Sequence, residues 1–81
     1  MLVRVLFFAS FRDAAGREEE DRELPPGSRV SDLWRDLSRD IALLSRFPVM
    51  PPAAVNLEYV PAGTELHDGD EVAFLPAVAG G

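Results

Sequence analysis

The fold is decided by residues 31–44, which read SDLWRDLSRDIALL. Large apolar residues recur there at the spacing of one face of an α-helix, namely Leu33, Trp34, Leu37, Ile41 and Leu44. Charged residues take the opposite face, with two Asp–Arg pairs three residues apart. Ser31 is the expected N-cap, and Val30 before it the expected hydrophobic staple. The stretch predicts an amphipathic helix over 31–44 in which Trp34 belongs to the core.

On the N-terminal side of this helix, residues 2–8 predict a strand rich in Val, Leu and Phe. Arg4 has to reach water, and side chains alternate between the two faces of a strand. The residues expected on its outward face are therefore Leu2, Leu6 and Phe8. Those expected in the core are Val3, Val5 and Phe7.

The segment between this strand and the helix predicts two smaller elements. Residues 10–15 suit a short helix, with Ser10 as its cap and Gly16 as its left-handed end. The acid-rich residues 17–24 are interpreted as a solvated edge strand, and an acidic recognition patch is the alternative.

On the C-terminal side, residues 45–52 contain three prolines and predict no regular element. Residues 54–60 predict a strand, and Asp68-Gly69-Asp70 predicts a tight turn into a last strand over 71–76. Alternation in that strand places Val72 and Phe74 on one face. It places three residues on the other: Glu71, Ala73 and Leu75.

This order of elements predicts an α+β fold, in which one main helix packs on one face of a mixed sheet. It is the β-grasp, or ubiquitin-like, arrangement, with the first and last strands side by side at the centre. We expect a β-grasp domain over residues 1–76 and a flexible tail over 77–81, which ends in Gly80-Gly81. Glycine lacks a β-carbon, so this tail can thread a narrow channel.

Composition narrows the function. The chain has 81 residues and a net charge of −6, which disfavours nucleic acid and favours a basic partner surface. It has no cysteine, which excludes disulfides and thiolate metal sites and permits a cytoplasmic location. No apolar stretch suits a signal peptide or a membrane span. All eight basic residues are arginine, so no side-chain amine could capture an activated carboxyl terminus.

The sequence contains no catalytic constellation. His67 stands beside a turn without oriented partners and is expected to be an ordinary exposed residue. Asp68, Asp70 and Glu71 lack the spacing of a calcium loop, and no metal site is expected. What remains is an outward apolar patch formed by Phe8 and Leu75, with the tail directly after it. Such a patch usually marks a partner site, although residues 45–52 could instead cover it.

Four parts of the sequence resemble the small subunit of molybdopterin synthase. They are Val5-Leu6-Phe7-Phe8-Ala9 followed by Arg12, then Ala54-Val55-Asn56, then residues 68–76, and then Gly80-Gly81. Members of that family are β-grasp sulfur carriers. The resemblance implies a docking face at Phe8, Arg12, Tyr59 and Leu75, and a functional end at the carboxylate of Gly81.

The resemblance also implies the chemistry and the partners. A ubiquitin-activating-enzyme-like adenylyltransferase would use ATP and Mg²⁺ to activate the terminal glycine, and a sulfur donor would convert it to a thiocarboxylate. The large synthase subunit, in a heterotetramer with this chain, would then transfer the sulfur to precursor Z. The chain itself would bind no cofactor and would not be an enzyme alone.

Three alternatives remain open from the sequence. The chain could be a sulfur carrier for thiamine thiazole synthesis or tRNA thiolation. It could be a ubiquitin-like modifier that is attached through Gly81 to lysines of target proteins. It could also be a plain interaction module with a frayed glycine end.

Overall fold

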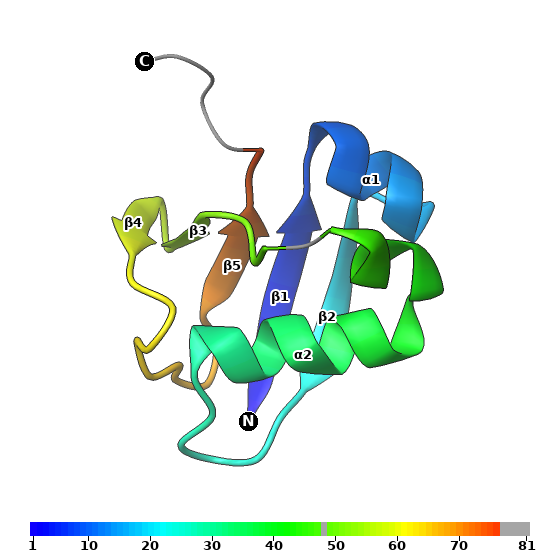
Figure 1. Cartoon of the computed structure of the whole chain (residues 1–81). Helices are drawn as coiled ribbons and strands as arrows, with labels where there is room; N and C mark the ends of the chain where they lie inside the picture. The colour runs from blue at the N-terminus through cyan, green and yellow to red at the C-terminus, as the bar shows by residue number, and fades with distance from the viewer. Residues whose placement is uncertain (48, 77–81) are drawn as a thin grey trace.

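The computed structural model describes residues 1–47 and 49–76 (Figure 1). Its elements, in chain order, are β1 (Leu2–Phe7), α1 (Ala9–Ala15), β2 (Glu19–Glu23), α2 (Val30–Asp40), the 3₁₀ helix η1 (Ala42–Arg46), β3 (Ala53–Val55), β4 (Glu58–Val60) and β5 (Glu71–Phe74). The five strands form a mixed sheet in the order β2-β1-β5-β3-β4.

The parallel pair β1 and β5 lies at the centre of the sheet. Val5 is opposite Val72, and Phe7 is opposite Phe74. All four side chains are buried, together with Val3. β2 pairs antiparallel with β1 on one side, and β3 pairs antiparallel with β5 on the other. The predicted central pair and its inward residues are confirmed.

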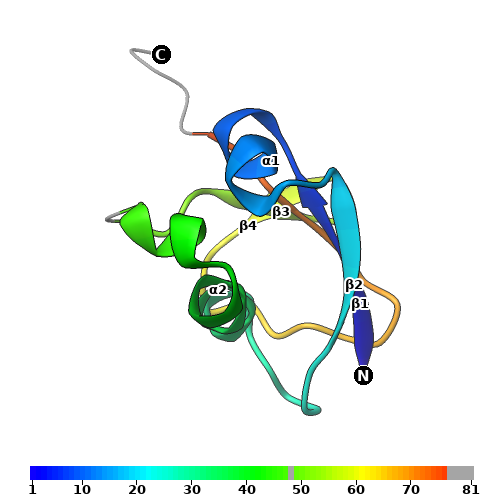
Figure 2. The ribbon, with the colours of Figure 1, turned by 90° about the vertical axis from the view of Figure 1, so that its right-hand side faces the viewer.

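α2 crosses one face of the sheet, as the two perpendicular views show (Figures 1 and 2). Its buried residues Val30, Leu33, Trp34 and Leu37 face the strands. The Trp34 ring packs edge-on against Phe11, with ring centroids 5.9 Å apart, and at a tilt of 55° against Phe74, with centroids 5.1 Å apart. The fold is therefore the predicted β-grasp arrangement, and Trp34 belongs to its core.

α2 also makes a charged contact with the edge strand β2. Arg22 donates hydrogen bonds from one terminal nitrogen to Glu20 (2.6 Å) and from the other to Asp36 (3.2 Å) and Asp40 (2.5 Å) on α2. Partial burial lowers the pKa of the Arg22 guanidinium, but the hydrogen bonds and charges of these carboxylates outweigh it and raise that pKa above its usual value. β2 is the predicted edge strand, and this network fixes α2 against it.

The bounds of the main helix differ from the prediction. α2 begins at Val30, one residue before the expected cap Ser31, and Arg29 takes the cap position. Carbonyls of a distant loop satisfy the first helical N–H groups, since Val30 N donates to Thr64 O and Ser31 N to Ala62 O. The α-helix ends at Asp40, and η1 follows Ile41.

Two other predictions at helix ends are corrected. Ser45 and Arg46, expected to be irregular, lie in η1, which stops at Phe47 because a residue before proline avoids the helical region. In α1, Ser10 lies inside the helix and Phe8 is the capping residue. The left-handed end of α1 at Gly16 is confirmed by its φ of 75°.

The predicted single strand over 54–60 is wrong. The chain forms the hairpin of β3 and β4, which turns at Asn56 (φ 50°) and Leu57 (φ 72°). Two successive left-handed residues are typical of a type I′ turn, which asparagine tolerates at its first position. Asn56 is also held in place, because its side-chain oxygen accepts the Glu71 N–H at 3.0 Å and its amide donates to Asp70 at 3.0 Å.

Candidate partner-docking site

The outer face of the sheet, opposite α2, carries the predicted outward residues. Phe8 is 44 % exposed at the end of β1, and Leu6 is half-buried. Because β1 and β5 are parallel, Phe8 and Leu75 follow their strands at the same end of the sheet. Parallel pairing is thus what brings together two residues that lie 67 positions apart.

A groove of ≈ 200 Å³, which we call the docking groove, opens on this face. Its lining is mostly apolar and comes from five segments: Leu6, Phe8, Ala54, Leu57, Tyr59, Glu71, Ala73 and Leu75. Leu57 is 92 % exposed and Tyr59 is 64 % exposed. An exposed apolar surface of this kind is typical of protein-interaction sites, so the groove is the candidate docking surface.

Three of the four predicted docking residues line the groove, namely Phe8, Tyr59 and Leu75. Arg12 does not line it. Arg12 lies on α1, about half-exposed, with its guanidinium 3.8 Å from the carboxylate of Glu18. Its contact with a partner stays a prediction.

Sequence reasoning missed Leu57 because residues 54–60 were interpreted as one strand. Asn56, a poor strand former, was the available signal for a turn at that point. Leu57 lies in this turn, at the rim of the groove, which Tyr59 on β4 also lines.

Of residues 45–52, those that the structure describes (45–47 and 49–52) do not line the docking groove. Phe47 and residues 49–52 instead line a separate hollow with Ser10, Phe11 and Pro76. The segment is tied to the end of β5, since Leu75 N donates to Pro52 O at 3.1 Å. The described part of this loop therefore leaves the groove open.

The carboxyl terminus follows this groove in the sequence. Leu75 lines the groove, and Pro76 is the last described residue. The predicted functional residues Gly80 and Gly81 lie outside the described residues, as does the predicted tail over 77–81. The boundary between domain and tail stays a prediction.

The remaining polar residues form no reactive cluster in the described part of the chain. His67 is exposed, with its Nδ1 4.0 Å from the Asp70 carboxylate. Among residues 1–47 and 49–76, no group of three or more His, Cys, Asp or Glu side chains could hold a metal ion. No helix in these two ranges is long and apolar enough to cross a bilayer.

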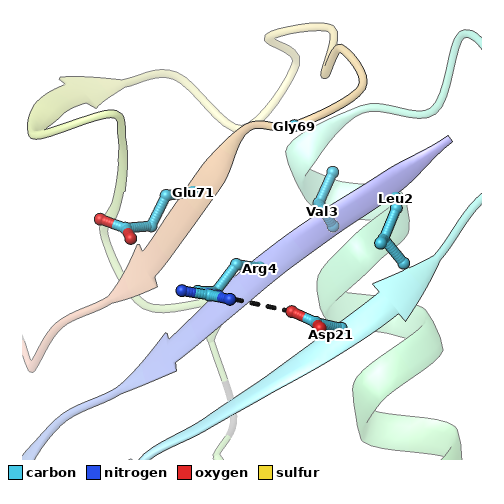
Figure 3. Close-up of a pocket in the computed structure, with 6 residues that line it drawn as sticks. All are labelled: Leu2, Val3, Arg4, Asp21, Gly69 and Glu71. Atoms are coloured by element: carbon cyan, nitrogen blue, oxygen red, sulfur yellow. Dashed lines mark hydrogen bonds and ion pairs between the residues drawn. The ribbon is translucent and has the colours of Figure 1, made fainter.

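Beside the docking groove lies a second hollow, of ≈ 230 Å³, which we call the Arg4 hollow. Figure 3 shows Arg4 between Asp21 of β2 and Glu71 of β5. The Arg4 Nε lies 3.5 Å from Asp21 Oδ1. Glu71 lines both the Arg4 hollow and the docking groove.

Comparison with known proteins identifies the family. The sequence model of the ThiS family matches residues 5–81. The chain belongs to the ThiS family. A molybdopterin synthase sulfur carrier subunit of Chlamydomonas reinhardtii is 39% identical over 83 residues, which covers 100% of both chains. The resemblance found in the sequence is thereby confirmed.

Solved structures agree with this. A Pyrococcus furiosus protein, described as molybdopterin converting factor subunit 1, has a TM-score of 0.87 at 36% identity and covers 96% of this chain and 99% of its own. A Helicobacter pylori complex of subunits 1 and 2 of molybdopterin-converting factor matches with a TM-score of 0.69 at 26% identity, covering 100% of both chains. The small archaeal modifier protein 1 of Methanosarcina acetivorans has a TM-score of 0.78 at 26% identity, and the match covers 99% of this chain and 96% of that protein.

Proposed function

We propose that this ThiS-family chain is the sulfur carrier subunit of a molybdopterin synthase. The observation that carries the proposal is the docking groove, which ends at Leu75, six residues before the terminal Gly81. In a partner bound at the groove, the distance from the groove to the site that accepts Gly80-Gly81 would be limited by the length of these six residues. The end-to-end likeness to the Chlamydomonas sulfur carrier supports the same assignment.

The chemistry takes place at the carboxylate of Gly81. An adenylyltransferase partner, using ATP and Mg²⁺, joins that carboxylate to AMP and releases pyrophosphate. A donor of sulfide-level sulfur then displaces AMP and leaves a thiocarboxylate. When this sulfur passes to precursor Z, the bond between it and the acyl carbon breaks, and water restores the Gly81 carboxylate. A free carboxylate is a poor electrophile, so the demanding step belongs to the activating enzyme. The chain contributes recognition and an arm, binds no cofactor, and is not catalytic alone.

The large synthase subunit is the partner proposed for the docking groove, in a heterotetramer. Its support is the Helicobacter complex of two such subunits. Phe8, Tyr59 and Leu75 provide the apolar contact, and Arg12 on the neighbouring helix α1 is the proposed polar contact. The catalytic groups are then those of the large subunit, and the reaction takes place in the cytoplasm.

The decisive experiment removes Gly81. Deletion shortens the arm by one residue, about 3.5 Å of reach, and a misplacement of about 1 Å can already lower a rate about a hundredfold. We expect dithiolene formation from precursor Z, with sulfur-loaded carrier and large subunit, to be abolished. The melting temperature should change little, since Gly81 is proposed to make no packing contact. Near-normal turnover by the deletion variant would refute the proposed function.

The likeness to a small archaeal modifier favours one second candidate, a protein modifier. Mass spectrometry of the protein purified from its native host separates the two. A sulfur carrier gains the mass difference between sulfur and oxygen at its C-terminus, whereas a modifier is found joined to lysines of larger proteins.

A further inference from the structure

The outer face of the sheet carries charge of one sign next to the docking groove. Glu19, Asp21 and Glu23 alternate outward along β2, and Glu71 points outward from β5. We call these four residues the acidic strip. Among the described strand residues, Arg4 is the one basic side chain on this face, because Arg22 points toward α2.

Arg4 neutralises only part of the acidic strip. It makes a single long contact with Asp21, at 3.5 Å, and both side chains remain more than half exposed. In the described part of the chain, no arginine lies within ion-pair distance of Glu19, Glu23 or Glu71. Glu19 and Glu23 are also exposed to solvent.

The acidic strip is continuous with the docking groove. Glu71 lines the groove itself, and Figure 3 shows the same residue beside Arg4. Glu19 is the register partner of Leu6, another groove residue, on the neighbouring strand. Paired residues on adjacent strands lie about 5 Å apart. A protein that fills the groove therefore reaches the acidic strip with the side chains around its apolar contact.

We infer that the partner docking in this groove carries arginine or lysine side chains beside its apolar contact, and that these lie along β2. The inference rests on the proposed function, in which the partner is the large synthase subunit. It specifies that the docking surface of that subunit is positively charged where it meets β2. Exposed charges at the rim of an interface act mainly on the association rate and on orientation, because solvent screens their contribution to the final affinity.

The experiment reverses single charges. Glu19→Arg and Glu23→Arg alter the strip without removing a groove residue, and both keep the chain free of lysine. Glu65→Arg is the matched control, since Glu65 is exposed and lines neither the docking groove nor the Arg4 hollow. Association with the large synthase subunit of the same organism is followed by stopped-flow fluorescence at several salt concentrations. Thermal melts verify that each variant is folded.

At low ionic strength we expect each strip variant to associate about three- to tenfold more slowly than the parent, and the control to change less than twofold. The difference should shrink at about 1 M salt, where charges are screened beyond about 3 Å. Equal slowing by all three variants would attribute the effect to net charge and overturn the inference. Unchanged rates in the strip variants would overturn it as well.

These outcomes are separable from a failure of the proposed function. If the inference alone is wrong, the parent still binds the large subunit and Leu75→Asp still weakens that binding. If the proposed function is wrong, the parent does not bind this subunit at all.

Discussion

At the scale of single residues, Leu57 combines two unfavourable properties. It is a bulky residue in the left-handed region (φ 72°), and its side chain is 92 % exposed. The left-handed conformation costs a non-glycine residue about 1–2 kcal/mol. Glycine would suit this turn position better, so a leucine here serves something other than the stability of the hairpin. Leu57 lies at the rim of the docking groove, where its exposed side chain can contact a partner.

Leu57→Gly should therefore separate stability from binding. We expect the free energy of unfolding to stay level or rise by about 1 kcal/mol, while affinity for the large synthase subunit falls about tenfold through lost apolar contact. Urea unfolding and calorimetry measure the two quantities. Leu43→Ala, which trims an exposed leucine outside the groove, is the control and should leave affinity unchanged. Full affinity in Leu57→Gly would exclude Leu57 from the interface.

Phe8 and Leu75 should behave as interface anchors. Truncating a well-packed apolar anchor typically costs about 2 kcal/mol of binding free energy or more. We expect Phe8→Ala or Leu75→Asp to weaken binding by that amount and to retain a cooperative melt, because both side chains lie outside the core. Titration calorimetry provides the check, and unchanged affinity in a folded variant would count against the groove as the docking site.

At the scale of elements, most of the fold could be predicted from the alternation of side chains along the strands and from the helical periodicity of residues 31–44. The faces of β1 and β5 followed from the position of Arg4 and of the buried valines and phenylalanines, and the groove residues that these two strands contribute were thereby placed correctly. The β3–β4 hairpin could not be found in this way, because its turn lacks glycine and depends on contacts between Asn56 and residues 70–71. The start of α2 was missed for the same reason, since carbonyls of a loop 31 and 34 residues further along the chain accept the N–H groups of Ser31 and Val30.

The contact between β2 and α2 should depend on Arg22. Arg22→Met leaves three carboxylates near one another without their shared cation, and Glu20 and Asp36 are mostly buried. We expect a loss of about 2 kcal/mol in the free energy of unfolding, measured with urea. Arg35→Met is the control, because the Arg35 side chain is 76% exposed and, among the described residues, pairs with Asp32 alone. It should cost less than about 0.5 kcal/mol.

The raised pKa of Arg22 fixes how its contribution to the free energy of unfolding depends on pH. A group whose pKa is raised on folding contributes stability that is fully present below its unfolded pKa and lost only as pH rises through its folded pKa. For Arg22 both values lie far above neutrality. We therefore expect the difference in unfolding free energy between the parent and Arg22→Met to stay constant from about pH 7 to about pH 9. A difference that shrinks over this interval would contradict the assignment.

At the scale of the whole molecule, the two ends of the sheet differ in chemistry. The strands β1 and β5 run in the same direction (Figure 1), so Phe8 and Leu75, which follow them, lie at one end of the sheet. The N-terminus lies at the opposite end, and the Met1 ammonium donates to Leu24 O at 2.8 Å. Since the chain has no lysine, this ammonium is its sole amine. Gly81 follows Leu75 by only six residues, so we expect its activated carboxylate to react with no amine of its own chain.

This separation predicts that the activated chain does not acylate itself. With the adenylyltransferase, ATP and Mg²⁺ but no sulfur donor, the parent should lose its adenylate to water and form no covalent self-adduct.

Arg12→Lys places an amine on α1, at the end of the sheet where Phe8 and Leu75 lie, and should form an amide with Gly81 as AMP leaves. A short tether gives an effective concentration on the order of millimolar, so this adduct should exceed that of Arg35→Lys, whose amine lies on α2. Denaturing gels and peptide mass spectrometry reveal the adducts. A self-adduct of the parent at Met1 would show that the position of its one amine gives no protection.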